Sequence, residues 1–205
     1  MDRKLYQNIV FLASLIYKNM AYPDNFRLKA KMVKLSGFRA EIFEFDEYNI
    51  IIFCGTNSIR DWITNIQMIY KKPKQFYEAL EFVLESYNQQ KKMYIVGHSL
   101  GGAIAEYVGN AINKDNIIVI TFNGAGVAHL IKPNFIDNVY HLVTTKDILN
   151  RLTKILPFKL FKHIGKVVVI KDDKSWNGLQ SHSNWQVFMS FSENERGVIN
   201  ETLTN

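Results

Sequence analysis

The sequence has little of what marks several classes of protein. It contains one cysteine, Cys54, so no intrachain disulfide can form. A single cysteine suits a reducing compartment and so predicts a cytoplasmic location, with non-classical export as the alternative. No apolar run approaches the roughly 18 residues of a membrane-spanning helix. The four prolines are scattered, and no repeat or low-complexity linker divides the chain, which predicts a single domain over residues 1–205.

The charge is unbalanced toward basic residues. Lys and Arg number 25 against 19 Asp and Glu, which gives a formal net charge of +6 at pH 7. A basic surface favours an anionic partner, either a phospholipid surface or nucleic acid. Because no zinc pattern, basic helix or aromatic RNA-binding signature accompanies the charge, we do not expect nucleic acid to be that partner.

The first residues carry part of a signal-peptide pattern. An Arg3-Lys4 pair precedes an apolar stretch from Ile9 to Ile16. No small-x-small cleavage site follows the stretch, and its apolar residues recur at helical spacing. These residues are Leu5, Ile9, Leu12, Leu15 and Ile16. The pattern predicts an amphipathic helix that packs on the core rather than a cleaved signal.

Short apolar runs typical of buried strands alternate with helical patterns along the rest of the chain. The runs cover residues 49–55, 93–97, 116–122, 139–145 and 167–170, and the helical patterns cover 74–90, 103–112 and a segment from about 184. Residues 38–46 instead alternate apolar and polar side chains, which predicts a half-buried strand. The alternation of strands and helices predicts the α/β class, with a mainly parallel sheet and helices on both faces. In such a sheet the chemistry lies beyond the carboxyl ends of the strands.

The pentapeptide Gly97-His98-Ser99-Leu100-Gly101 matches the pattern G-x-S-x-G. In this pattern a serine sits on a sharp turn between strand and helix, and the flanking glycines leave room for that turn. A buried strand precedes the motif and a helix rich in small residues follows it, as the pattern requires. We therefore predict Ser99 as a nucleophile.

Two blocks resemble the class 3 lipases, the family of fungal triacylglycerol lipases and their bacterial and plant relatives. IVGHSLGGAIAEYV (residues 95–108) is similar to the family's nucleophile turn, and IIFCGTNSIRDWITNI (residues 51–66) to its strand, oxyanion loop and lid. Cys54 departs from the family pattern, which usually has arginine there. The resemblance implies an α/β-hydrolase fold and ester hydrolysis without metal or cofactor.

The acid and the base follow from chain order and sheet edge. In this fold the order is serine, then acid, then histidine. Asp147 comes directly after a strand, at the correct edge, although it could instead only cap the helix that Ile148 and Leu149 begin. His182 follows the last predicted strand in a loop, whereas His163 precedes that strand and so lies at the wrong edge. We predict Asp147 and His182 as the acid and base.

Two donors are expected to stabilise an oxyanion. One is the backbone N–H of Leu100, which follows the nucleophile. The resemblance implies Thr56 as the other and implies a lid formed by Ile59, Trp62 and Ile63. Simple alternatives stay open, because Thr56 could be an ordinary turn hydroxyl and the lid an ordinary surface helix.

The sequence thus predicts a serine hydrolase that cleaves carboxylic esters, with lipid esters as the preferred substrate. A non-lipolytic esterase or amidase and a catalytically silent lipid-binding domain are the alternatives. The segment from Arg151 to Lys171 mixes six basic residues with apolar ones and contains no acidic residue. It could dock on an anionic bilayer, or its lysines could simply be solvated while its apolar residues pack inward.

Overall fold

A seven-stranded sheet forms the centre of the molecule. The computed structural model describes residues 3–35, 38–54, 74–134, 137–155, 161–171 and 177–183. The strands lie in chain order across the sheet. They are β1 (Arg27–Val33), β2 (Arg39–Glu44), β3 (Tyr48–Phe53), β4 (Lys92–His98), β5 (Ile117–Phe122), β6 (Val139–Thr144) and β7 (Lys166–Ile170). Strand β2 runs antiparallel to both β1 and β3, and β3 to β7 are parallel. The four central residues of β2 are all buried, although the alternating sequence predicted a half-buried strand there. The predicted mainly parallel sheet is confirmed.

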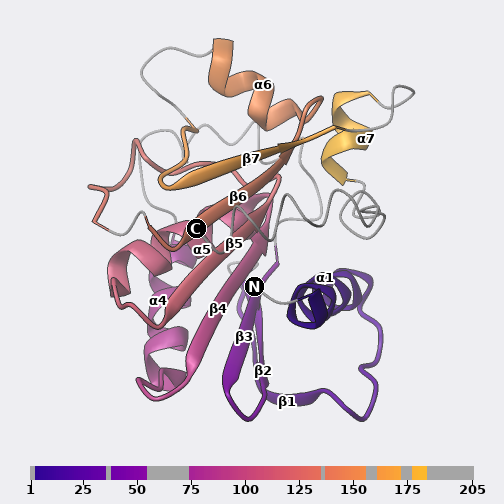
Figure 1. The fold of residues 1–205 in the computed structure, drawn as a ribbon, viewed down its shortest axis with the longest axis vertical. Coiled ribbons are helices and arrows are strands. Elements are labelled where there is room, and N and C mark those ends of the chain that lie inside the picture. The colour runs from indigo at the N-terminus through magenta and orange to yellow at the C-terminus, as the bar shows by residue number, and fades with distance from the viewer. Residues whose placement is uncertain are drawn as a thin grey trace.

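Helices cover both faces of the sheet, as predicted. Helix α1 (Arg3–Lys18) lies on one face, whereas α4 (Lys74–Ser86) and α5 (Leu100–Ile112) lie on the other (Figure 1). Helices α6 (Ile148–Ile155) and α7 (Gly178–Ser183) lie near β6 and β7. Helices α4 and α5 return the chain to the amino-terminal edge of the sheet, where the next parallel strand begins. The carboxyl ends of β4, β5 and β6 therefore lie together at the opposite edge.

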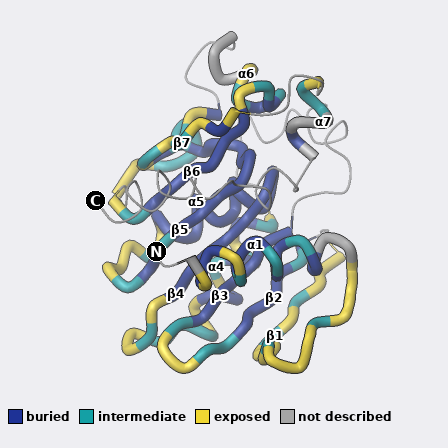
Figure 2. The backbone as a smooth tube through the Cα atoms, turned by 45° about the vertical axis from the view of Figure 1, so that its right-hand side comes forward, coloured by how far each residue is buried: buried dark blue, intermediate teal, exposed yellow. Residues whose placement is uncertain are grey.

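Each face of the sheet buries its own apolar cluster. Beneath α4 and α5 the cluster includes Phe53, Phe76 and Ile95. Beneath α1 it includes Phe43, Ile52 and Phe122. Figure 2 shows the result, with the central strands buried and β1 largely exposed. A core on both faces explains why the central strands read as continuous apolar runs rather than as alternating ones.

The predicted N-terminal helix is confirmed as α1. Its helically spaced apolar residues are all buried, namely Leu5, Ile9, Leu12, Leu15 and Ile16. Among the described residues, none of the helices combines the length and the apolar character that crossing a bilayer demands.

Strand β1 was not predicted. It pairs with β2 and with no other strand among the described residues, so it forms an edge of the sheet. Its lysines form ion pairs with acidic side chains of β2. The Nζ atom of Lys29 lies 3.3 Å from Oε1 of Glu44, and the Nζ atom of Lys31 lies 2.9 Å from Oε1 of Glu41. Because one face of this strand is polar and exposed, it lacks the continuous apolar run that identified the central strands.

Candidate active site

Ser99 occupies a sharp turn between β4 and α5. Its backbone angles are φ 56° and ψ −122°, in the left-handed half of the map that residues other than glycine rarely adopt. Contacts with the next strand hold this conformation. The Ser99 N–H donates to the Phe122 carbonyl at 3.3 Å, and the Ser99 carbonyl accepts from the Ala125 N–H at 3.2 Å.

Both glycines of the motif are required by close backbone approach. A Cβ atom on Gly97 would collide with the Gly101 carbonyl, and one on Gly101 would collide with the Phe53 carbonyl. Any side chain at either position would therefore push the helix away from the sheet. The pattern G-x-S-x-G is a packing requirement of this turn.

The Ser99 hydroxyl is buried at the start of α5. Ser99 is the N-cap residue of that helix, but its side chain makes no capping hydrogen bond. Only 1% of the residue is exposed, and Oγ has no hydrogen-bond partner among the described residues. Leu100 follows as the first helical residue. The first N–H groups of a helix lack intrahelical partners and carry partial positive charge, which suits them to an oxyanion.

Asp147 lies just beyond the end of β6 and uses both carboxylate oxygens. Oδ1 accepts the backbone N–H of Asn150 at 2.8 Å, which caps α6. Oδ2 accepts a hydrogen bond from Nδ1 of His182. The capping role and the contact with the predicted base, which the sequence presented as alternatives, occur together. Only 1% of Asp147 is exposed.

His182 lies in α7, whereas the sequence led us to expect a loop. Asn177 caps the start of this short helix, since its Oδ1 atom accepts the Leu179 N–H at 3.0 Å. Asparagine is a common capping residue, so this helix start was a signal in the sequence that was not predicted. Because Nδ1–H donates to Asp147, the lone pair of the imidazole lies on Nε2. This atom is buried and has no partner among the described residues.

His98, the neighbour of Ser99 in the chain, contacts His182. Its Nε2 atom lies 2.8 Å from the backbone carbonyl oxygen of His182, and the two rings have centroids 4.9 Å apart. The contact brings His182 beside the turn that carries Ser99. Burial, with a smaller contribution from His182, lowers the pKa of His98 to about 3, so this imidazole is neutral.

A second polar residue supports the turn that leads to Asp147. Asn123, which directly follows β5 and has a φ of 43°, is fully buried. Its Oδ1 atom accepts the backbone N–H of Thr144 at 2.8 Å. The Thr144 carbonyl in turn accepts the Asp147 N–H at 3.2 Å.

Cys54 has the properties of a structural thiol rather than of a nucleophile. It is 6% exposed, and the Arg39 Nε–H donates to its sulfur at 3.2 Å. Burial raises the pKa of the thiol to about 11. Because the thiolate is the nucleophilic form, this residue is a poor nucleophile at neutral pH.

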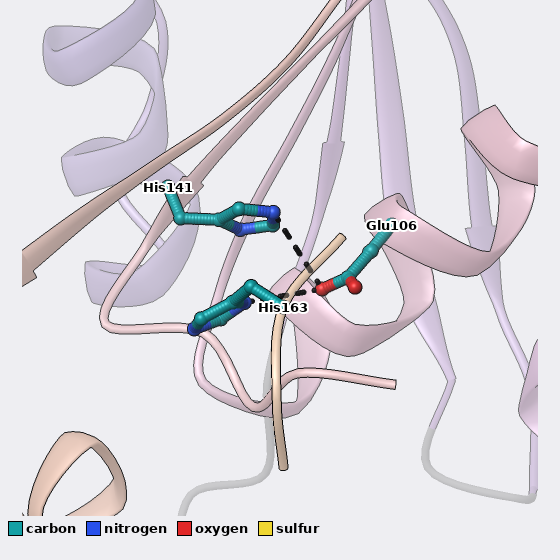
Figure 3. A group of neighbouring side chains, drawn as sticks. All are labelled: Glu106, His141 and His163. Carbon is teal, nitrogen blue, oxygen red and sulfur yellow. Dashed lines mark hydrogen bonds and ion pairs between the residues drawn. The ribbon is translucent and has the colours of Figure 1, made fainter. Parts of the chain in front are cut away.

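Glu106 of α5 forms a buried polar cluster with His141 and His163 (Figure 3). Glu106 of α5 is fully buried and accepts hydrogen bonds on both oxygens. Oε1 accepts the backbone N–H of Ile164 at 2.8 Å, and Oε2 contacts Nδ1 of His163 at 3.2 Å. This clamp joins α5 to the segment before β7. It gives His163, which we did not expect to be catalytic, a structural contact.

His141 of β6 completes the cluster, stacking on His163 with ring centroids 3.9 Å apart. Glu106, His141 and His163 are ligand types for a transition metal, and their donor atoms lie within 4.8 Å of one another. However, Nε2 of His141 lies 2.6 Å from the Ile164 carbonyl, and a carbonyl only accepts. This nitrogen therefore carries a proton, and an ion would have to displace it. The cluster is satisfied by its own hydrogen bonds.

Other predicted site residues lie outside the described residues. Thr56, the predicted second oxyanion donor, belongs to this group, and so do the predicted lid residues Ile59, Trp62 and Ile63. Their roles stay predictions. The helix expected from about residue 184 also lies outside the described part of the chain.

A comparison with family models decides the affiliation. Residues 17–147, more than half of the chain, match the family described as phospholipase-like, with a Tle-like phospholipase domain. The chain belongs to this family. By its family and its fold, the chain is a lipase- and phospholipase-like α/β-hydrolase domain.

Sequence and structure relatives of this Tle-like phospholipase domain agree with the family. It is 33% identical over 95 residues to an extracellular phospholipase A1 of Serratia liquefaciens. That match covers 45% of this chain and 29% of the relative, so the chain spans less than a third of that protein's length.

Solved lipases share the fold. A propeptide complex of Rhizomucor miehei lipase superposes with a TM-score of 0.63 at 17% identity, covering 93% of this chain and 79% of that one. Lip2 lipase of Yarrowia lipolytica gives 0.58 at 16% identity, covering 83% and 80%. The resemblance to class 3 fungal lipases is therefore confirmed for the fold.

Proposed function

We propose that this protein hydrolyses carboxylic esters of lipids, with phospholipids as the preferred substrates, through an acyl-Ser99 intermediate. The observation that carries the proposal is the hydrogen-bonded pair of Asp147 and His182 beside the turn of Ser99. Membership of a phospholipase family and the phospholipase A1 relative support a lipid substrate.

The reaction follows from the orientation of the imidazole. Nε2 of His182 takes the proton of the Ser99 hydroxyl while Oγ attacks the ester carbonyl carbon. Asp147 stays ionised and stabilises the imidazolium through Nδ1–H. The carbonyl oxygen becomes an oxyanion, held by the Leu100 N–H and, in this proposal, by Thr56. His182 then donates its proton to the leaving alcohol, and the acyl group remains on Ser99.

Water completes the cycle by the same groups. His182 removes a proton from water, the hydroxide attacks the acyl carbon, and the bond to Ser99 Oγ breaks. The fatty acid leaves and Ser99 recovers its proton from His182. Each step needs only the side chains already named, a substrate and water.

Two further parts of the proposal concern the lipid surface. Ile59, Trp62 and Ile63 would form a lid that opens on aggregated lipid. The basic segment from Arg151 to Lys171 would contact an anionic bilayer, in keeping with the exposed side chains of Arg151, Lys162 and Lys171. Phe161 does not contribute exposed apolar surface to this contact, because it is only 8% exposed, which agrees with the alternative that the apolar residues of the segment pack inward.

Covalent labelling tests the mechanism. A fluorophosphonate should label the wild type at Ser99 and leave Ser99→Ala unlabelled. Ser99→Ala and His182→Ala should each reduce phospholipid hydrolysis by about 10³-fold or more while the circular dichroism spectrum stays the same. Asp137→Asn is the matched control, since Asp137 is exposed and precedes β6 at the opposite edge. Undiminished hydrolysis by Ser99→Ala would refute the proposal.

A further inference from the structure

The contact between His98 and His182 joins a side chain to a backbone group. A carbonyl oxygen only accepts, so the 2.8 Å separation requires that Nε2 of His98 carry a proton and donate it. Both residues are almost completely buried, with 5% and 1% of their surface exposed. A buried carbonyl left without this donor would cost about 1–3 kcal/mol. The bond therefore constrains where the backbone of His182 can lie.

The element that carries His182 needs such an anchor. Helix α7 has six residues, too few to be stable through its own hydrogen bonds. Asp147 holds the ring of His182 through Nδ1. A single contact at Nδ1 leaves the ring free to pivot about that bond, whereas a second contact at the backbone carbonyl fixes the other end of the residue. Together the two contacts determine where Nε2 points.

We propose that His98 is a positioning residue, whose Nε2–H holds the backbone carbonyl of His182 and so aligns the imidazole with the Ser99 hydroxyl. This inference rests on the function proposed above. It assigns to the second residue of G-x-S-x-G in this chain a task distinct from that of Ser99. The neutral state of His98 fits the task, because a second positive charge beside His182 would oppose its protonation during turnover.

The experiment compares two substitutions of His98. His98→Phe keeps a ring of similar size but has no donor, whereas His98→Gln keeps an N–H donor at a comparable distance from the backbone. Active sites are counted by fluorophosphonate labelling, and kcat and KM are measured on a soluble ester per labelled site. We expect His98→Phe to lower kcat about 10- to 100-fold with little change in KM, because small misplacements of a base are costly. His98→Gln should restore most of the loss.

His129→Phe is the matched control. His129 is half-buried and packs edge-on against Phe161, so a phenyl ring preserves that contact, and kcat should stay at the wild-type level. Wild-type kcat in His98→Phe, or equal losses in His98→Phe and His98→Gln, would overturn the positioning role. Either result would leave the triad intact, because the triad is tested by Ser99→Ala and His182→Ala alone.

Discussion

The side chain of Asn123 accepts the backbone N–H of Thr144 at 2.8 Å and the Thr144 hydroxyl at 3.3 Å. This contact fastens the end of β5 to the end of β6, three residues before Asp147. Asn123→Ala leaves a buried N–H unpaired, and we expect a loss of about 1–3 kcal/mol in the free energy of unfolding. Turnover should fall as well, because the turn that presents Asp147 loses its support.

Asn113→Ala is the control for this prediction. Asn113 also has a positive φ, 49°, but it is exposed at the end of α5. Both substitutions remove an asparagine from a left-handed conformation, so urea unfolding separates backbone strain from the lost hydrogen bond. Equal destabilisation of the two variants would show that the Asn123–Thr144 contact contributes nothing.

The two carboxylate oxygens of Asp147 make different contacts, one to the start of α6 and one to His182. We therefore expect substitutions of Asp147 to affect stability and activity separately. Asparagine caps a helix about as well as aspartate, so Asp147→Asn should keep the cap of α6 and unfold near the wild-type temperature. It should nevertheless lower kcat about 10³- to 10⁴-fold, because an amide cannot hold His182 in the same state. Asp147→Ala should lose both the cap of α6 and the contact with His182, so its free energy of unfolding should be about 1 kcal/mol lower than that of Asp147→Asn. An active Asp147→Asn would exclude the carboxylate from the mechanism.

Two buried neutral histidines predict a loss of stability in acid. Burial lowers the pKa of His98 to about 3 and that of His141 well below 6.5. Below pH 6.5 these histidines are protonated in the unfolded chain but stay neutral in the folded protein. The free energy of unfolding that is present above pH 6.5 therefore decreases as the pH falls toward 3. Each histidine should contribute up to about 1.4 kcal/mol per pH unit.

Urea unfolding at pH 7, 6 and 5 measures this dependence. His98→Gln removes one of the two histidines, and its stability should fall less steeply with decreasing pH than that of the wild type. An unchanged slope in His98→Gln would mean that His98 does not titrate on unfolding.

The basic segment before and along β7 predicts binding to anionic vesicles. The side chains of Val167 and Val169 are 48% and 58% exposed, and Lys162 is exposed beside them in the chain. Replacing Lys154, Lys159 and Lys162 with glutamate should weaken vesicle binding most clearly at low salt, since each cation contributes about 1 kcal/mol near the surface. Hydrolysis of a small soluble ester should stay the same.

A triple variant of equal charge provides the comparison. Lys92, Lys114 and Lys132 are exposed, and the first two lie at the amino-terminal edge of the sheet, far from the predicted docking segment. Replacing these three with glutamate should leave most of the vesicle binding in place in a sedimentation assay. Equal losses in the two triple variants would point to net charge alone rather than to this segment.

The sequence was most informative where the chain repeats a simple geometric rule. The carboxyl ends of parallel strands share an edge, so Asp147 and His182 could be predicted because each follows a strand, whereas His163 precedes one. The structure brings Asp147 and His182 into contact. The apolar runs also predicted the central strands closely, because burial on both faces leaves little freedom in composition.

Contacts between distant residues were not predictable in the same way. His98 and His182 are 84 positions apart, and strand periodicity gives the face of a side chain but not the backbone group it meets. Glu106 likewise lies in a helix of small apolar residues, where only its burial against the backbone of Ile164 explains a carboxylate. Strand β1 was missed because a solvated edge resembles a loop in composition.

Strand β1, which pairs only with β2 among the described strands, affects how the protein behaves at high concentration. The backbone N–H and C=O groups on the outer side of an edge strand can pair with a strand of another molecule, including a second copy of this chain. Along β1, Arg27, Lys29 and Lys31 alternate with smaller or apolar residues. Two such edges brought together would place like charges opposite each other, which is unfavourable. The lysines of β1 thus discourage self-association, while their ion pairs to β2 let the strand remain in the sheet.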